Sequence, residues 1–219
     1  MIITFKINNG FNHYDIDVIA PEKCPHCGSD FVPTVLDSIE YPSGNKYVGV
    51  LYCELCSNIS FIDVYQPKNQ KLAIVKSLYP QKAIFDLPHE IKKFYPDFAN
   101  FYQQAITAEV CNLKDICGMG LRKALEALIK EYALQKFPLE EKHIKNEFLS
   151  ATVKRIKNEH IQILARKISW LCNDQVHYSY IKHPEYGLSD IKDFIKALCY
   201  FILMEKIFEK ANTISNKNN

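Results

Sequence analysis

Two Cys-x-x-Cys pairs constrain the fold of this chain more than any other feature. Cys24 and Cys27 form the first pair, Cys53 and Cys56 form the second, and the segment between the pairs is long enough for one β-hairpin. A two-residue spacer folds each pair into a tight turn with both sulfurs on one side, and four thiolates complete the tetrahedron that Zn²⁺ prefers. Because no coordination position stays open, we expect one structural zinc ion rather than a catalytic one.

The first pair permits a second interpretation. The sequence from Cys24 to Cys27 resembles the active site of thiol oxidases of the thioredoxin fold, in which the first cysteine begins a helix that lowers its pKa. Here Gly28 opens a β-like pattern instead, so we favour metal binding and interpret His26 as a spacer residue. The remaining cysteines stand singly in helical segments and are expected to be small core residues. They are Cys111, Cys117, Cys172 and Cys199.

The chain changes character near residue 75. Before it, short β-rich runs alternate with turn residues, and hairpins are expected around residues 8–10 and 42–45. After residue 82, apolar residues recur at the spacing of amphipathic helices. We therefore expect an α+β chain with a small, β-rich, zinc-ribbon-like unit over residues 1–75 and a helical domain over residues 82–214.

Two long helices are expected from their apolar stripes. One covers residues 113–132, although Gly118 and Gly120 weaken its first turns and favour a start near Leu121. The other covers residues 191–211 and ends the ordered part of the chain.

Composition leaves the partner open. Among 219 residues, 27 Lys and Arg stand against 25 Asp and Glu, so the formal net charge of +2 argues neither for nor against nucleic acid. The N-terminal residues show no signal-peptide pattern. The longest apolar run, residues 197–204, is much shorter than the stretch of about 20 residues that spans a bilayer. We expect a cytoplasmic protein with no membrane partner, in a compartment that keeps free thiols reduced.

Three stretches of the helical part carry a family resemblance. They run from Phe85 to Pro88, from Leu121 to Leu128 and from Leu171 to His177, and the long final helix follows them. In this order they resemble a widespread bacterial family, the domain of unknown function 4145, whose members often carry a preceding cysteine-rich zinc unit. That family is similar in turn to the HEPN (higher eukaryotes and prokaryotes nucleotide-binding) superfamily.

The resemblance implies a HEPN-like antiparallel helical bundle over residues 82–214, commonly a homodimer. Many HEPN proteins are metal-independent ribonucleases, with a motif of an arginine and, a few residues later, a histidine, often with Asn or Asp directly after the arginine. His177 matches the histidine and Asn173 matches the residue after the arginine. Cys172 stands at the position of the arginine itself.

The missing arginine weakens the expectation of catalysis. A histidine can transfer protons near neutral pH, but the planar fork of an arginine stabilises phosphate charge, and a neutral thiol cannot replace it. Two hypotheses therefore stand. The first is a catalytically degenerate binding or regulatory module that contacts RNA or a protein partner in a bacterial defence or toxin–antitoxin setting. The second is a metal-independent endoribonuclease that uses His177.

Further residues of the helical part are candidates for the binding site. Arg122 could supply the missing charge from a neighbouring helix, and Glu126 either shares a polar groove with it or forms ordinary salt bridges. Tyr178 and Tyr180 closely follow the histidine and could stack on a base or pack inside the domain. The basic residues of segment 154–167 could follow a phosphate backbone, although a solvated helix face explains them as well.

Overall fold

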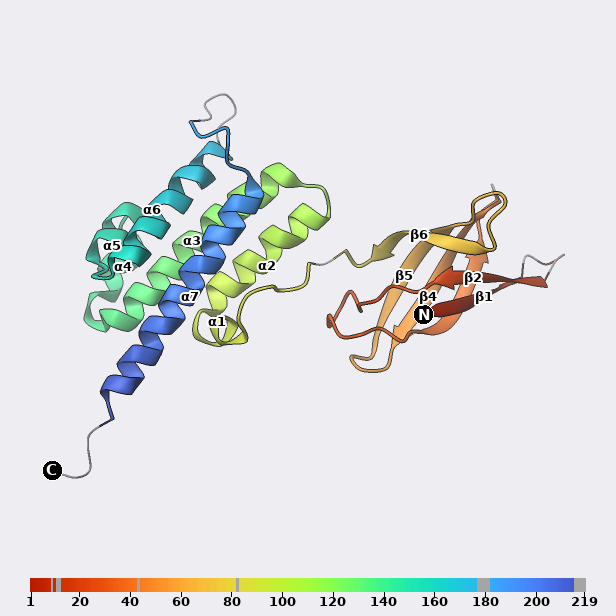
Figure 1. Cartoon of the computed structure of the whole chain (residues 1–219), viewed down its shortest axis with the longest axis horizontal. Helices are drawn as coiled ribbons and strands as arrows, with labels where there is room; N and C mark the ends of the chain where they lie inside the picture. Colours follow the sequence, from red (N-terminus) through yellow and green to blue (C-terminus); the bar gives the residue numbers. More distant parts are fainter. Residues whose placement is uncertain (9, 11–12, 43, 82, 177–181, 215–219) are drawn as a thin grey trace. The chain divides into compact units, whose positions relative to one another are not determined.

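The computed structural model describes residues 1–8, 10, 13–42, 44–81, 83–176 and 182–214. The chain divides into two compact units, Met1–Ile84 and Phe85–Asn219. The first, called the sheet unit below, is built from strands, and the second, called the helical unit, is built from helices (Figure 1). The chain is therefore α+β overall, and each unit is described by itself.

One six-stranded sheet makes up the sheet unit, with its strands in the order β1-β2-β6-β5-β4-β3. In chain order the strands are β1 (Ile2–Asn8), β2 (His13–Ile19), β3 (Thr34–Glu40), β4 (Lys46–Cys53), β5 (Asn58–Tyr65) and β6 (Leu72–Tyr79). Neighbouring strands are antiparallel except for β2 and β6. These two are parallel and pair Asp17 with Leu72 and Val18 with Ala73. Strand β6 thus joins the N-terminal hairpin to the β3–β4–β5 meander.

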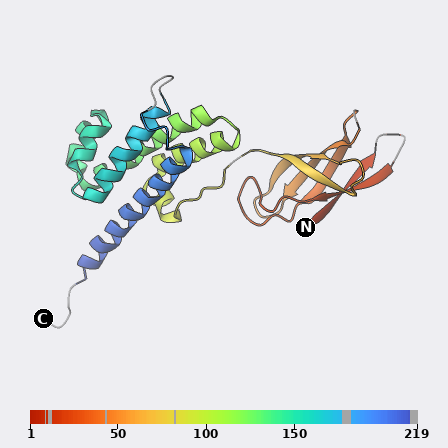
Figure 2. The same cartoon turned by 45° about the horizontal axis from the view of Figure 1, so that its top comes forward.

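The sheet curls until its edge strands approach each other (Figure 2). The Ser38 hydroxyl of β3 donates a hydrogen bond to the Lys6 carbonyl of β1 at 3.1 Å. Alternate residues of β1 and β4 face the interior, as the period-two burial of both strands shows. Phe5 is fully buried there, and a Cβ added at Gly49 would lie 2.2 Å from its ring. Glycine at this position therefore lets the nearly closed sheet hold a large aromatic ring.

The expected small zinc-ribbon-like unit followed by a HEPN-like antiparallel helical bundle is wrong. The N-terminal region is a nearly closed six-stranded sheet over residues 2–79, and the expected boundary at residue 75 falls inside β6. The hairpin signals in the sequence are local, whereas the parallel pairing of β2 with β6 joins segments that lie far apart in the chain. The residue pattern therefore predicted strands but not the sheet that unites them.

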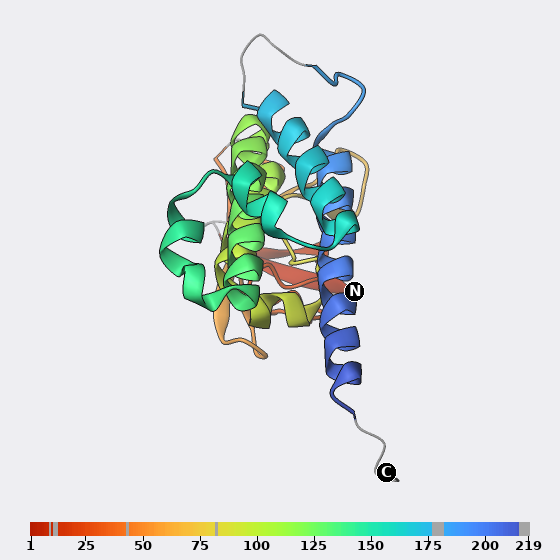
Figure 3. The same ribbon diagram turned by 90° about the vertical axis from the view of Figure 1, so that its left-hand side faces the viewer.

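The helical unit combines long and short helices. Helix α3 contacts α2, α4, α5, α6 and α7, and therefore forms the centre of the unit (Figure 3). The described helices are α1 (His89–Phe94), α2 (Pro96–Val110), α3 (Lys114–Lys136), α4 (Glu141–Asn146), α5 (Leu149–Arg155), α6 (Glu159–Asp174) and α7 (Leu188–Asn212), with a 3-10 turn η1 (Pro138–Glu140) before α4. None of the described helices is both long enough and apolar enough to cross a membrane.

Helix α3 begins at Lys114, several residues before the start near Leu121 that Gly118 and Gly120 favoured in the sequence. Both glycines let a neighbour come close to the helix. A Cβ at Gly118 would lie 2.5 Å from the Cβ of Gln175, and a Cβ at Gly120 would lie 2.8 Å from the Cβ of Ala105. Close packing against α2 and against the residue that follows α6 therefore offsets the low helix propensity of glycine.

Candidate metal centre and helical polar site

The four paired cysteines lie in two turns of the sheet unit. Cys24 and Cys27 lie in the loop between β2 and β3. Cys53 is the last residue of β4, and Cys56 lies in the turn to β5. The β3–β4 hairpin thus separates the pairs in sequence, and the curled sheet returns the second pair to the first.

The two turns share one backbone geometry. The Cys24 carbonyl accepts a hydrogen bond from the Gly28 N–H at 2.9 Å, and the Cys53 carbonyl accepts one from the Ser57 N–H at 2.8 Å. Gly28 has a φ of 74° and Ser57 a φ of 55°, both in the left-handed region. Glycine adopts this region without cost, whereas Ser57 does so with some backbone strain. The second turn therefore takes the geometry of the first without a glycine.

The sulfur atoms of these cysteines form one cluster. All four Sγ atoms lie within 4.8 Å of one another. The Sγ atoms of Cys24 and Cys56 are 3.8 Å apart, well beyond the bond length of about 2.05 Å in a disulfide. Four sulfurs placed about 2.3 Å from a zinc ion at tetrahedral angles would be about 3.8 Å apart. The cysteines therefore form a possible metal site whose donor set and spacing suit zinc.

In each pair the first cysteine is more deeply buried than the second. Cys24 and Cys53 are buried in the apolar core of the sheet unit, whereas Cys27 is exposed and Cys56 is half-buried. Burial raises the pKa of the Cys24 thiol to about 12. Hydrogen bonds from the backbone and side chain of Ser29 lower the pKa of Cys27 to about 6. A thiolate in an apolar core requires a compensating positive charge, which a bound metal ion supplies.

His26 lies within the first pair but outside the sulfur cluster. Its Nε2 donates a hydrogen bond to the carbonyl oxygen of Ile59 on β5 at 2.9 Å. This bond fastens the first cysteine loop to the strand that follows the second pair. Cys24 lies in a turn between strands, so it does not have the position at a helix start that activates the thiol of a thioredoxin-type oxidase.

Two of the expected site residues meet in the helical unit. Arg122 of α3 donates a hydrogen bond from Nε to Oδ1 of Asn173 on α6 at 3.0 Å. The Nη1 atom of Arg122 is buried and has no hydrogen-bond partner among the described residues. Burial raises the pKa of the neighbouring Cys172 thiol to about 12, and the positive charge of Arg122 opposes that rise. The guanidinium of Arg122 therefore lies beside both Asn173 and Cys172 of α6.

The other expected residues do not join this pair in the described structure. Glu126 forms a salt bridge with Lys130, one helical turn later, at 2.8 Å. Lys123, the other cation on this part of α3, places its Nζ 4.4 Å from the centroid of the Phe101 ring. Three expected residues lie outside the described part of the chain: His177, Tyr178 and Tyr180.

A buried acid and its histidine partner were not predicted from the sequence. Asp174 is only 6% exposed, and its Oδ2 lies 2.7 Å from Nδ1 of His183. Oδ2 also accepts hydrogen bonds from the backbone N–H groups of Lys182 and His183, at 3.2 and 2.9 Å. The sequence signal was an acid and a histidine nine residues apart, a spacing with no periodic meaning.

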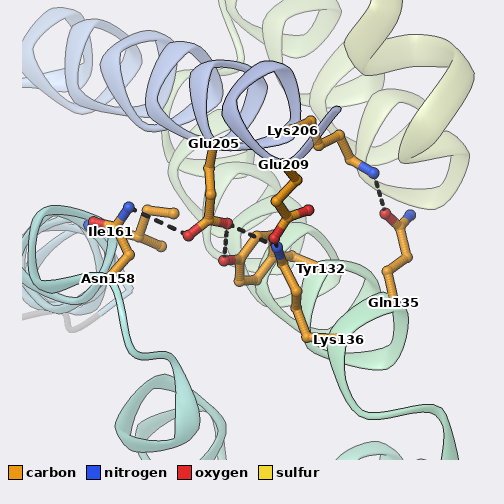
Figure 4. A network of polar contacts seen from close by, with 8 residues as sticks. All are labelled: Tyr132, Gln135, Lys136, Asn158, Ile161, Glu205, Lys206 and Glu209. Atoms are coloured by element: carbon orange, nitrogen blue, oxygen red, sulfur yellow. Dashed lines mark hydrogen bonds and ion pairs between the residues drawn. The ribbon is translucent and has the colours of Figure 1, made fainter. Parts of the chain in front are cut away.

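A second missed feature is a set of polar contacts centred on Glu205 of α7, called the Glu205 network (Figure 4). Tyr132 of α3 donates its hydroxyl to Glu205, and the Nζ of Lys136 lies 3.1 Å from the same carboxylate. Lys136 also pairs with Glu209. The Asn158 amide donates to Glu205 at 3.4 Å, while its side-chain oxygen caps α6. The network ties α3, α6 and α7 together.

A scan of the chain against protein-family models finds no match, and searches of curated proteins and of solved structures find none either. The resemblance to the domain of unknown function 4145 stays a prediction, as do the roles expected of His177 and Asn173.

Proposed function

We propose that this protein is an RNA-binding module. A zinc ion on the four paired cysteines stabilises the sheet unit, and Arg122 with Asn173 forms a phosphate-binding point on the helical unit. The observation that carries the proposal is the buried Nη1 of Arg122, which has no hydrogen-bond partner among the described residues. The zinc part rests on the clustered sulfur atoms.

The Nη1 nitrogen of Arg122, which has no partner in the described part of the chain, points to an external acceptor. Buried N–H groups in native proteins almost always have a partner, so an exception needs an explanation such as a missing ion or ligand. The planar guanidinium matches the oxygens of a phosphate in a bidentate manner. Asn173 already binds Nε at 3.0 Å, which fixes the plane of the guanidinium before a ligand arrives.

The charge of the surrounding helices favours phosphate as that acceptor. Arg166 and Lys167 are exposed on α6, the helix that carries Asn173, and Lys154 is exposed on α5. Arg155 differs from them, because Glu140 and Glu147 neutralise its guanidinium. The exposed cations supply the sequence-independent attraction on which binding to a phosphate backbone depends.

A metal-independent endoribonuclease is the second candidate function. The observation that favours it is that Arg122 stands beside Cys172, the position of the motif arginine. In such a reaction the 2′-oxygen attacks the adjacent phosphorus, the bond to the 5′-oxygen breaks, and a 2′,3′-cyclic phosphate forms. His177 would accept the 2′-hydroxyl proton, and Arg122 would stabilise the charge on the phosphate.

Fluorescence anisotropy of a labelled single-stranded RNA tests the binding proposal. We expect Arg122→Ala to weaken binding about tenfold or more, because hydrogen bonds to a charged group are lost. Arg122→Lys keeps the charge but loses the fork, so we expect an intermediate loss. Arg166→Ala is the matched control, since it removes an exposed arginine from the neighbouring helix and should cost much less. Unfolding temperatures of all variants show whether the fold is retained.

The same preparations separate binding from cleavage. RNA is incubated with wild-type protein and with His177→Ala in chelator, and products are examined for 2′,3′-cyclic phosphate ends. Cleavage by wild type that is absent from His177→Ala supports the ribonuclease. Equal RNA affinity of wild type and Arg122→Ala would contradict the proposed phosphate site. It would favour the alternative hypothesis that the module binds a protein partner. The homodimer and the defence or toxin–antitoxin setting stay predictions.

A further inference from the structure

A cavity of about 340 Å³ lies on the helical unit between the C-terminal turn of α6, the segment after it and the first turns of α7. Its walls combine aromatic rings with side chains of both charges. They include Lys167, Trp170, His183, Glu185, Tyr186 and Phe194. Ligand pockets in proteins begin at about 300 Å³, so this cavity has room for one small ligand.

Asp174 fixes the orientation of His183 in this wall. Its Oδ2 lies 2.7 Å from Nδ1 of His183 and also accepts hydrogen bonds from two backbone N–H groups. Burial favours the neutral form of Asp174, but the side-chain hydrogen bond with His183 and the backbone bonds from Lys182 and His183 outweigh it and hold the pKa of Asp174 below its usual value. The carboxylate therefore favours a proton on Nδ1 and leaves Nε2 as the ring nitrogen for a ligand.

The aromatic part of the wall is arranged for stacking. The rings of Trp170 and His183 are parallel within 4°, with centroids 6.4 Å apart, which is an offset pair. Trp170 is 47% exposed and Tyr186 is 41% exposed, so large aromatic surfaces remain open to solvent. The exposed indole and phenol rings therefore offer flat apolar surface to a further aromatic ring.

A cation stands beside this aromatic surface. The Nζ of Lys167 lies 4.2 Å from the centroid of the Trp170 ring. A ligand that stacks on the indole would therefore bring an attached anionic group within reach of the ammonium. A purely structural role for Asp174, in which it holds the chain that follows α6, accounts for its backbone hydrogen bonds. Such a role accounts neither for the exposed indole of Trp170 nor for the position of Lys167 over that ring.

We infer that this cavity binds a nucleoside monophosphate, with the base stacked on the Trp170 and His183 rings and the phosphate held by Lys167. The nucleotide is either a free molecule or one unit of an RNA strand. Binding of a free nucleotide does not depend on the Arg122 site. Binding of a nucleotide within an RNA strand rests on the proposed RNA-binding function.

The chain offers a direct reporter, because Trp170 is the one tryptophan among its 219 residues. Intrinsic tryptophan fluorescence of the full-length protein is titrated with AMP, GMP, CMP and UMP, and separately with a short single-stranded RNA. Ribose 5-phosphate and inorganic phosphate are the controls without a base. We expect saturable quenching by at least one nucleotide or by the RNA, and none by the controls.

Two variants show whether the quenching arises in the cavity. We expect His183→Ala to weaken the nucleotide affinity about tenfold, since loss of one stacking partner typically has an effect of this size. Lys167→Ala should reduce the affinity for the monophosphate but not for the corresponding nucleoside. Lys142→Ala, which removes an exposed lysine of α4 in the same unit, should leave both affinities unchanged.

The outcomes separate this inference from the proposed function. Quenching by free nucleotides supports the pocket whether or not RNA binds, and quenching by RNA alone supports it as a subsite of a bound strand. No quenching by any nucleotide, together with an unquenched complex of RNA whose anisotropy shows binding, overturns the pocket but leaves RNA binding intact. Quenching that is equal in wild type and in both cavity variants overturns it as well.

Discussion

The sheet unit and the helical unit join distant segments by different means. In the sheet unit the loop before β3 and the turn after β4 meet at four sulfur atoms within 4.8 Å of one another. In the helical unit α3, α6 and α7 meet at the neutral and charged side chains of the Glu205 network (Figure 4). The first arrangement suits a metal ion from outside the chain, whereas the second uses only the chain's own side chains. The two units should therefore respond differently to the removal of metal.

Metal removal should have the largest effect and should fall on one unit only. We expect a strong chelator or Cys53→Ser to unfold the sheet unit while helix content is retained, because structural zinc contributes on the order of 10 kcal/mol to the folding of small domains. Metal analysis should give about one zinc per chain before treatment. Far-UV circular dichroism follows the helices, and limited proteolysis follows the sheet unit.

Cys111→Ser is the matched control for this experiment, since it changes a cysteine outside the sulfur cluster. We expect it to keep both the zinc and the resistance of the sheet unit to proteolysis. Fresh protein with far less than one zinc per chain, or a sheet unit that resists proteolysis after the zinc is removed, would refute the structural role.

Two glycine substitutions should have a smaller effect, and they compare packing in the two units. Gly49→Ala places a methyl group 2.2 Å from the Phe5 ring, and we expect a loss of about 1–3 kcal/mol in the free energy of unfolding. Gly120→Ala places one 2.8 Å from the Cβ of Ala105, but alanine gains up to about 1 kcal/mol in helix propensity. Its net loss should therefore be smaller. Urea unfolding measures both.

A compensating change sharpens the glycine comparison. Phe5→Leu should make room for the new methyl group, so the double variant Phe5→Leu with Gly49→Ala should lose less stability than the sum of the single variants. Additive losses would show that the destabilisation by Gly49→Ala does not arise from the contact of the new methyl group with Phe5.

Acidification should have the smallest effect and should fall on the helical unit. Burial raises the pKa of Glu205, but the donors Tyr132, Lys136 and Asn158 outweigh it and hold the pKa below its usual value. A depressed carboxyl pKa adds stability above the unfolded value of about 4.3, and this stability is lost as the pH falls through the folded pKa. Helix unfolding in urea should therefore become easier as the pH falls below about 4.3.

Glu205→Gln separates this contribution from general acid unfolding. The variant should be less stable by about 1 kcal/mol near neutral pH, where it loses charged hydrogen bonds. It should also lose less stability than wild type on acidification, because it has no carboxyl group to protonate at this position. Parallel pH profiles of the two proteins would show that Glu205 does not carry the effect.

The sequence predicted local features well and distant pairings poorly. The spacing of Cys24, Cys27, Cys53 and Cys56 was sufficient to predict their cluster, because two tight turns leave few other arrangements for four sulfurs. The extent of the sheet was not predictable in this way. Its closure depends on the pairing of β2 with β6 and on the contact of Phe5 with Gly49, and neither leaves a periodic signal in the sequence.

The helical unit teaches the same lesson at its polar sites. Arg122 and Asn173 were candidates because of their residue types, but only the fold shows that their side chains meet at 3.0 Å. Asp174 was not considered at all, since an acid near a helix end is ordinarily solvated. Its partner His183 lies beyond the turn, so no helical spacing connects the two residues.

The parallel pairing of β2 with β6 has a consequence for synthesis on the ribosome. The four clustered cysteines all precede β6 in the chain and leave the ribosome before it, so the N-terminal hairpin must wait for β6 at Leu72–Tyr79 before it gains its neighbour in the sheet. During that interval β2 presents an open edge, which is a site for pairing with other chains. Early capture of zinc would limit this exposure, because it fixes the turns that bracket β3 and β4 before the last strand has left the ribosome.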